Sequence, residues 1–468
     1  MARVNENDLT SSQQRYLDGF VERYVQRTQR SKQQERRYRP VFADFRAMSV
    51  FRMATKELCY PIVAVTGQGA QIQDVDDNTY TDYTMGFGVN LLGHQPEFIV
   101  SAVEKQVRDG MLLGPQSSLA GSVAEMICEL TGVERVVFNN SGTEAIATAL
   151  RIARAHTGRG KIALFSGTFH GHNDATLVVP TGEGFNAQPM IHGVYSGTVE
   201  DTLLVPYGSQ ESLAVLREQA SSLAAIMVEP LPKSPNPGGL SPQEFIQGLR
   251  DICDESGAAL MFDEIFSGFR AHPGGAQAIL GIQADLTTYG KVLGGGLPIG
   301  VVTGKKSFID RIDGGSWDYG DSSYPAVNPT FAAGTFCKHP LAMVAARAIL
   351  THLREQGPEL QQTMNERTAK LLARLNGHFE DNNLKIRAGY TGYSWFRFEI
   401  LEKQPNRRQL PFLMQLLLYH LLHKGFYIWE WGNCAVSVAH TDQNHASFYD
   451  AVVSSIDELQ AGGFSFAG

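Results

Sequence analysis

The chain has 468 residues, of which 43% are hydrophobic, so it is long enough for two or three packed units. Its formal net charge of −8 argues against nucleic-acid binding as its main function. No apolar run reaches the ~20 residues that a membrane-spanning helix needs, and the longest candidate, around Leu410 to Leu422, is interrupted by Gln415 and His420. The five cysteines are widely spaced, with no CxxC pair and no cysteine–histidine cluster, which predicts a reduced cytoplasmic protein without a metal site.

Residues 1–45 are expected to form an N-terminal arm. The first ten residues are polar and lack the apolar core of a signal peptide. Residues 15–39 are rich in arginine and glutamine, with Tyr16, Phe20 and Tyr24 at helical spacing. This pattern predicts an amphipathic helix packed on its own protein or, alternatively, a linker or docking segment beside an acidic partner.

Residues 46–115 are expected to begin a small domain, in which Gln71 to Asp76 alternates like a short strand before a turn at Asp77 and Asn78. A large domain is expected over 116–340, where helical segments alternate with short apolar runs. This alternation is typical of a mostly parallel sheet with helices on both faces. The expected strands include Val136–Phe138, Ile162–Phe165, Ala225–Val228 and Leu260–Phe262.

Residues 341–468 are expected to complete the small domain. Long helices are predicted between 341 and 380. Strands are predicted at 397–399, 427–430 and 435–438. The chain shows no internal repeat and no low-complexity tract.

Polar residues stand directly at the ends of the expected strands of the large domain. Asn139, Glu229 and Asp263 each fall at a carboxyl end, where functional residues of such sheets gather. Lys291 follows another apolar strand and precedes a run of three glycines. A helix is expected from about Glu144 to His156, just after a small-residue loop.

Lysine, a strand-end aspartate and a small-residue loop at a helix N-terminus are the three groups that pyridoxal 5'-phosphate needs. Lys291 would form the Schiff base with the aldehyde of the cofactor and then carry protons. Asp263 would keep the pyridine nitrogen protonated. Ser141, Gly142 and Thr143 would offer backbone N–H groups to the phosphate. Asp263 could instead be a helix cap and Ser-Gly-Thr an ordinary turn, but their joint occurrence in this order favours the cofactor site.

From about Pro61 onward the chain resembles the class III aminotransferases of PLP fold type I, and among them glutamate-1-semialdehyde aminomutase. The motifs that carry the resemblance are Asn140-Ser141-Gly142-Thr143-Glu144, Phe169-His170-Gly171-His172, Val228-Glu229-Pro230, Phe262-Asp263-Glu264-Ile265, Gly290-Lys291, Gly334-Thr335 and Ser437-Val438-Ala439-His440-Thr441. The resemblance implies an α/β fold, with a seven-stranded, mostly parallel sheet between helices in the large domain and a smaller α/β terminal domain.

The same resemblance implies further cofactor contacts. Phe169 occupies the position of the aromatic residue that stacks on the cofactor ring, and His170, Glu229 and Ile265 fall within cofactor-binding motifs. Thr335 would reach the phosphate bound in the neighbouring subunit of a homodimer.

A narrower resemblance is to the aminotransferase domains of hybrid polyketide synthases and nonribosomal peptide synthetases. It rests on Ser31–Gln34, Tyr38–Asp44, Phe331–Pro340 and Ala439–Asp442. Those domains place an amine on a β-ketoacyl chain that is bound to an acyl carrier protein. The resemblance therefore implies transfer from an amino acid donor, glutamate or glutamine, to such a chain, with the carrier protein as a partner and the arm as a linker.

The alternative is an aminomutase or an ω-aminotransferase of small free keto acids or semialdehydes. Gly432 stands where the aminomutase has a glutamate, which argues against intramolecular amine transfer. Arg52 lies at the spacing of the carboxylate-binding arginine of the aminomutase, and Arg397 competes for that role. Either arginine could instead form a structural salt bridge.

Two other classes of protein fit less well. A nucleotide-binding dehydrogenase is disfavoured because no GxGxxG sequence opens a helix. A PLP-fold protein without catalytic activity is disfavoured because both Lys291 and Asp263 are present.

Overall fold

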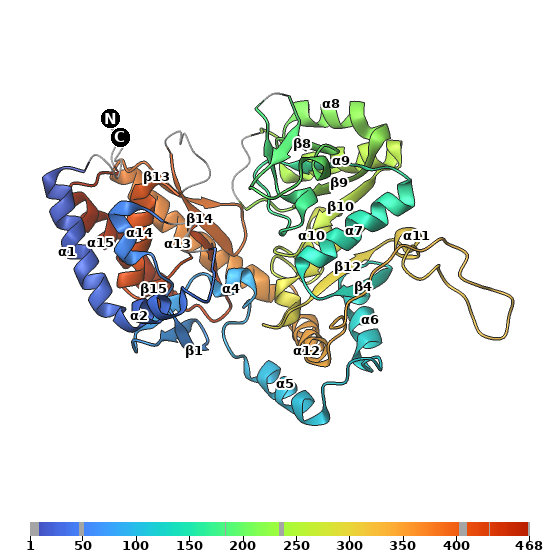
Figure 1. The fold of residues 1–468 in the computed structure, drawn as a ribbon, viewed down its shortest axis with the longest axis horizontal. Coiled ribbons are helices and arrows are strands. Elements are labelled where there is room, and N and C mark those ends of the chain that lie inside the picture. Colours follow the sequence, from blue (N-terminus) through green and yellow to red (C-terminus); the bar gives the residue numbers. More distant parts are fainter. Residues whose placement is uncertain are drawn as a thin grey trace. The chain divides into compact units, whose positions relative to one another are not determined.

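The computed structural model describes residues 9–45, 51–182, 184–233, 238–401, 410–429 and 431–466. The chain divides into two compact units (Figure 1): unit 1 comprises residues 1–96 and 362–468, and unit 2 comprises residues 97–361. The divisions thus fall after Pro96 and Gln361 instead of at the expected 116 and 341. The reason is helix packing, since α12 (Pro340–Gln356) contacts both α5 (Glu97–Asp109) and α6 (Leu119–Thr131) and ties these segments to unit 2.

A seven-stranded sheet of order β4-β12-β11-β10-β9-β5-β8 forms the centre of unit 2. Its strands are β4 (Arg135–Asn139), β5 (Lys161–Phe165), β8 (Thr202–Val205), β9 (Leu223–Val228), β10 (Ala259–Asp263), β11 (Leu286–Gly290) and β12 (Gly300–Gly304). All pairs are parallel except those that β12 makes with β4 and β11. The expected mostly parallel sheet is confirmed, and β12 is a strand that the sequence pattern did not predict.

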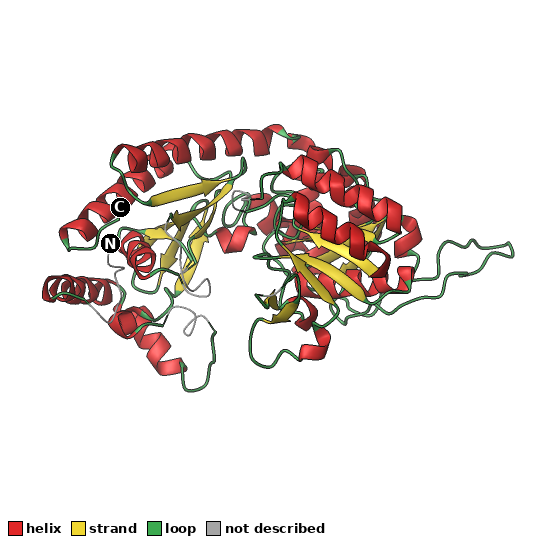
Figure 2. Ribbon diagram, turned by 90° about the horizontal axis from the view of Figure 1, so that it is seen from above, coloured by secondary structure: helices red, strands yellow, loops and turns green. Residues whose placement is uncertain are grey.

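Helices cover both faces of this sheet, as Figure 2 shows. On one face, Leu164 of β5 and Met227 of β9 belong to a buried cluster with the apolar side of α7 (Gly142–Thr157). On the other face, Phe165 contacts Phe245 of α9 (Pro242–Ser256), with ring centroids 5.4 Å apart. Successive side chains of a strand point to opposite faces, so strands buried on both sides read as unbroken apolar runs.

The remaining elements of unit 2 connect or flank this sheet. They are η2 (Asp174–Thr176), β6 (Val178–Pro180), β7 (Ala187–Pro189), η3 (Ser196–Thr198), α8 (Gln210–Gln219), η4 (Ala220–Ser222), α10 (Gly275–Leu280), η5 (Lys291–Gly294) and α11 (Lys306–Ile309). Between α11 and α12 the chain runs out as a long loop and returns (Figure 1).

Unit 1 contains two smaller sheets and several long helices. The sheets have the orders β1-β2-β3-β15 and β13-β14-β16. The elements are α1 (Ser11–Arg27), α2 (Gln29–Tyr38), η1 (Met53–Leu58), β1 (Ala64–Gln68), β2 (Gln71–Asp74), β3 (Thr79–Asp82), α4 (Met85–Gly88), α13 (Glu359–Asp381, whose first turn belongs to unit 2), β13 (Ile386–Tyr390), β14 (Trp395–Ile400), α14 (Phe412–His423), β15 (Phe426–Tyr427), β16 (Asn433–Ala435) and α15 (Asp442–Ala461).

Two of the expected strands are shorter than the sequence suggested. β15 ends at Tyr427, and Glu430, the end of the expected strand, lies outside the described residues. β16 ends at Ala435, so residues 436–438 are not a strand. Among the described residues, no helix is both long and apolar enough to cross a membrane.

The N-terminal arm is part of unit 1. Leu17, Phe20 and Tyr24 on one side of α1 are each only 1% exposed, and the Phe20 ring stacks on His420 of α14 at a centroid distance of 3.9 Å. The expected amphipathic helix packed on its own protein is therefore confirmed. Deleting the arm would uncover the surface of unit 1 that these side chains cover, so the arm cannot be removed as an independent linker.

The end of α2 presents a basic and aromatic surface. Arg36, Arg37, Tyr38, Val41 and Phe42 are exposed there, with Val41 exposed to 85%. We call these five residues the α2 surface.

Candidate active site

The carboxyl ends of three adjacent strands bring three titratable side chains together in unit 2. Glu229 follows β9, Asp263 ends β10 and Lys291 follows β11. Neighbouring strands lie ~4.8 Å apart, so residues at their ends share one edge of the sheet. The edge predicted from the sequence thus holds the predicted side chains.

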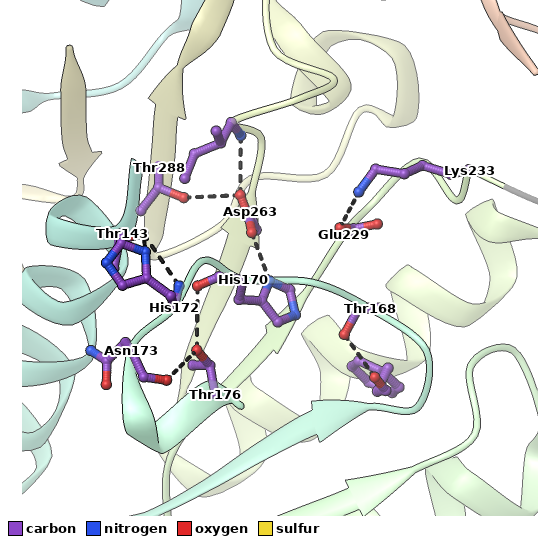
Figure 3. A network of polar contacts seen from close by, with 12 residues as sticks. Thr143, Thr168, His170, His172, Asn173, Thr176, Glu229, Lys233, Asp263 and Thr288 are labelled. Atoms are coloured by element: carbon purple, nitrogen blue, oxygen red, sulfur yellow. Dashed lines mark hydrogen bonds and ion pairs between the residues drawn. The ribbon is translucent and has the colours of Figure 1, made fainter. Parts of the chain in front are cut away.

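Asp263 is buried and hydrogen-bonded on both oxygens (Figure 3). His170 Nδ1 lies 2.6 Å from its Oδ2, and the backbone N–H of Ile265 donates to its Oδ1 over 3.1 Å. Burial alone would raise the pKa of Asp263, but the hydrogen bond and charge of His170 outweigh it, so this pKa lies below the usual value. Asp263 is therefore an anion held rigidly in place, and it caps no helix among the described elements.

His170 has a free ring nitrogen in a buried position. Its side chain is 1% exposed, and Nε2 has no hydrogen-bond partner among the residues that the structure describes. Because Nδ1 faces a carboxylate, it carries the proton in this pair. The imidazole therefore fixes the orientation of Asp263.

Lys291 stands in an uncommon backbone conformation. Its φ is 42°, in the left-handed region that costs a non-glycine residue energy and is found at functional sites. Its Nζ lies 5.2 Å from the centroid of the Phe266 ring. Desolvation, followed by the charge of Lys233, lowers the pKa of Lys291 to about 8. A lysine with this pKa is neutral in a substantial fraction of molecules near pH 8.

The N-terminus of α7 forms a cradle of backbone amides beside this edge. Ser141 caps the helix, and the next two residues, Gly142 and Thr143, have amides with no acceptor inside the helix. A Cβ on Gly142 would meet Ile265 Cδ1 at 2.7 Å, and one on Gly300 would meet the Ser141 carbonyl oxygen at 1.9 Å. The two glycines thus let β12 and Ile265 approach the amides.

The segment after β5 brings further predicted residues to the same place. The backbone N–H of His172 donates to Thr143 Oγ1 over 3.3 Å, so this segment lies against the start of α7. Phe169, next to the buried His170, is 61% exposed. An exposed aromatic ring beside a buried histidine and an amide cradle is free to lie against a flat ligand.

Three predicted residues do not belong to the elements that form this edge. Thr335 is exposed in the long loop before α12, one residue after Gly334, which packs against the Asn140 side chain. Arg52 and Arg397 both belong to unit 1. Arg52 donates to the Leu410 carbonyl over 2.6 Å, and Arg397 Nη2 lies 3.9 Å from a Glu399 oxygen.

Lys233 is a residue of the site that the sequence reasoning missed. Its Nζ lies 2.6 Å from Glu229 Oε1 (Figure 3) and 5.2 Å from the Phe266 centroid. The only signal in the sequence is a lysine four residues after a strand-end glutamate, which is weak because most lysines are solvated surface charges.

His170, Glu229 and Asp263 each offer one ligand-type atom, and these atoms lie within 4.8 Å of one another. Such a spacing could hold a metal ion. However, Lys233 already pairs with Glu229, and its positive charge opposes a cation. The charge pattern instead suits a ligand with a positive edge facing Asp263.

Glu264, the neighbour of Asp263, is fully buried and accepts a hydrogen bond from the Ala276 amide over 2.6 Å. Burial raises the pKa of Glu264 to about 7 from an ordinary value of 4.5. Because the folded state binds this proton more tightly, Glu264 contributes stability below pH 4.5 that is lost as the pH rises through 7. Sequence reasoning gave no sign of this.

In the wild type, the free energy of unfolding should fall by on the order of 3 kcal/mol between pH 4.5 and pH 7 because of Glu264. We expect this fall to be absent in Glu264→Gln. Denaturant unfolding at a fixed protein concentration across this range measures it. An unchanged pH dependence in the variant would show that Glu264 is ionised in the folded protein.

The profile of the aminotransferase class-III family matches residues 52–445. The chain belongs to the class III aminotransferases. It is 34% identical over 401 residues to a glutamate-1-semialdehyde 2,1-aminomutase of Alkaliphilus oremlandii, a match that covers 84% of this chain and 91% of that protein. The aminotransferases of this family are enzymes that depend on pyridoxal 5'-phosphate.

Solved structures agree with this assignment and establish PLP fold type I. A transaminase with PLP bound superposes with a TM-score of 0.80 at 28% identity, covering 93% of this chain and 99% of the other. A β-phenylalanine aminotransferase from Variovorax paradoxus gives 0.79 at 27% identity, covering 96% and 98%. The class III aminotransferase fold therefore spans nearly the whole chain.

The residues at the strand edge fit this cofactor. The backbone amides at the N-terminus of α7 suit a phosphate, and the buried anion of Asp263 suits a protonated ring nitrogen. When bound, the cofactor supplies an electron sink for the carbon that loses a proton.

Proposed function

We propose that this class III aminotransferase moves an amino group from an amino acid donor, glutamate or glutamine, to the oxo group of an acceptor in two half-reactions. The observation that carries the proposal is the pair formed by Lys291, with a pKa of about 8, and the buried, ionised Asp263 on the neighbouring strand. A neutral amine can bond to an aldehyde carbon and later accept a proton, and the carboxylate keeps the ring nitrogen charged.

The other predicted residues would hold the cofactor. Ser141, Gly142 and Thr143 would bind the phosphate, while Phe169 and Ile265 would contact the ring. His170 would orient Asp263 through the 2.6 Å contact. Glu229 would contribute at the edge of the site, where it pairs with Lys233.

For the acceptor we propose a small free oxo acid or semialdehyde. The names of the relatives support this choice, since glutamate-1-semialdehyde aminomutase and β-phenylalanine aminotransferase are named for small amino compounds. Intermolecular transfer is favoured over the aminomutase reaction, because Gly432 stands at a turn where the aminomutase has a glutamate and cannot supply a carboxylate. Arg52 and Arg397 remain candidates for binding the substrate carboxylate.

A second candidate acceptor is a β-ketoacyl chain on an acyl carrier protein. The observation that favours it is the α2 surface, whose Arg36 and Arg37 suit an acidic partner and whose Val41 and Phe42 add exposed apolar area. The named relatives support the free acceptor more than this one.

Mass spectrometry can test both acceptors. The purified holoenzyme is incubated with glutamate or glutamine and either free oxo acids and semialdehydes or β-ketoacyl carrier proteins. We expect the mass change of an oxo group replaced by an amine. This amination should be faster for the free compounds than for the carrier-bound chains. Faster amination of the carrier-bound chains, lost in Arg36→Glu/Arg37→Glu, would reverse the order of the two candidates, and no amination of any acceptor would overturn the proposal.

We also propose that the chain works as a homodimer, the state typical of class III aminotransferases. The long loop between α11 and α12 exposes aromatic side chains, among them Tyr319 at 87% and Phe331 at 73%, as an interface would. Thr335 would then reach the phosphate in the partner subunit.

Thr335→Ala is expected to weaken cofactor binding by ~1 to 3 kcal/mol, because a hydrogen bond to a charged phosphate is lost. Equilibrium dialysis of the cofactor measures this, with Ser322→Ala in the same loop as the control. Mixed dimers of the Thr335→Ala and Lys291→Ala chains should regain one intact site if Thr335 acts across the interface. Mixed dimers with no gain would mean that Thr335 acts within its own chain.

A further inference from the structure

Two lysine side chains in unit 2 lie near the same aromatic ring. The Nζ atoms of Lys233 and Lys291 each lie 5.2 Å from the centroid of the Phe266 ring. They are therefore separated by at most twice that distance, within the range at which charges in a partly desolvated site interact. The Lys233 side chain is 36% exposed to solvent. Lys291 directly follows β11 at the edge of the sheet.

The proton-transfer role of Lys291 requires a neutral amine. The charged groups that face it among the described residues are Lys233 and Arg270, which favour the neutral form, and Asp263 and Glu229, which favour the ammonium form. Lys233 exerts the largest of these charge effects. Glu229 Oε1 lies 2.6 Å from Lys233 Nζ, so these two side chains form one ion pair.

We propose that Lys233 is a positioning residue whose charge keeps Lys291 in its neutral, reactive form, and that Glu229 sets the strength of this effect by pairing with Lys233. The proposal rests on the proposed function only in taking Lys291 as the reacting amine. None of the predicted site residues had this role, and the Glu229–Lys233 pair gives Glu229 a function other than direct contact with the cofactor.

The ion pair makes two substitutions act in opposite directions. Lys233→Met removes a positive charge and leaves the Glu229 carboxylate unopposed, and both changes favour protonation of Lys291. Glu229→Gln removes a negative charge and frees the Lys233 ammonium, and both changes disfavour it. We expect the pKa of Lys291 to rise by about one unit in the first variant and to fall in the second.

The experiment measures the pKa of the amine itself. In the full-length protein stripped of cofactor, the rate at which Lys291 is acetylated is followed against pH by peptide mass spectrometry, because only the neutral amine reacts. In the holoenzyme, the pH dependence of the visible absorbance reports the protonation of the same nitrogen when it is bonded to the cofactor. Neither measurement needs turnover, so a failed activity assay and a failed proposal are distinguishable.

Lys233→Arg keeps the charge and should give the wild-type titration. Lys306→Met removes an exposed lysine of α11, which follows the end of β12 opposite to the end that pairs with Gly290, and should change nothing. A thermal midpoint for each variant confirms that it is folded. The proposal is overturned if Lys233→Met titrates like the wild type, if Lys233→Arg behaves like Lys233→Met, or if Glu229→Gln shifts the titration upward.

Discussion

Replacing Lys291 with alanine is expected to abolish amino transfer while the fold stays intact. The change removes the amine that bonds to the cofactor and the group that moves the proton, so both steps are lost together. The cofactor should still bind through the amides of Ser141, Gly142 and Thr143. Turnover within about tenfold of the wild type, a change in barrier of only ~1.4 kcal/mol, would contradict the assignment.

Mass mapping gives this prediction a second measurement. After reduction with borohydride, the cofactor should be attached to the peptide that contains Lys291 in the wild type and to no peptide in Lys291→Ala. Lys233, whose Nζ is equally far from the Phe266 ring, is the internal control. Attachment to Lys233 in the wild type would show that Lys233, and not Lys291, is the residue that bonds to the cofactor.

Asp263→Asn is expected to keep the cofactor and lose most of the activity. An amide cannot hold the ring nitrogen protonated, and the carbon that loses a proton then has a weaker electron sink. We expect the barrier to rise by roughly 3 kcal/mol, on the order of ~10²-fold in rate or more. Single-turnover rates with an amino acid donor measure this step alone.

Thr288→Val is the matched control for this variant. Thr288 Oγ1 lies 3.4 Å from the same carboxylate, so the substitution removes a long contact and leaves the charge. A small effect for Thr288→Val beside a large one for Asp263→Asn would show that the charge matters. Normal turnover of Asp263→Asn would leave Asp263 with a structural role only.

The sequence by itself determined the residues at the strand edge. Asn139, Glu229, Asp263 and Lys291 each stand where an apolar run ends, and in a parallel sheet such ends meet at one edge. It also determined the helix after Ser141 and the amphipathic α1, because helical spacing and capping are local properties of the chain.

Only the tertiary structure decided what these groups can do. The antiparallel β12 is a short run with glycine at both ends, and its direction depends on pairing with β4 and β11, which lie far away in the sequence. The charge on Lys291 depends on its distance from Lys233 and Asp263, and the proton on Glu264 depends on complete burial. Local pattern specifies where a side chain leaves the backbone, but pKa values follow from charges and solvent exclusion brought together by folding.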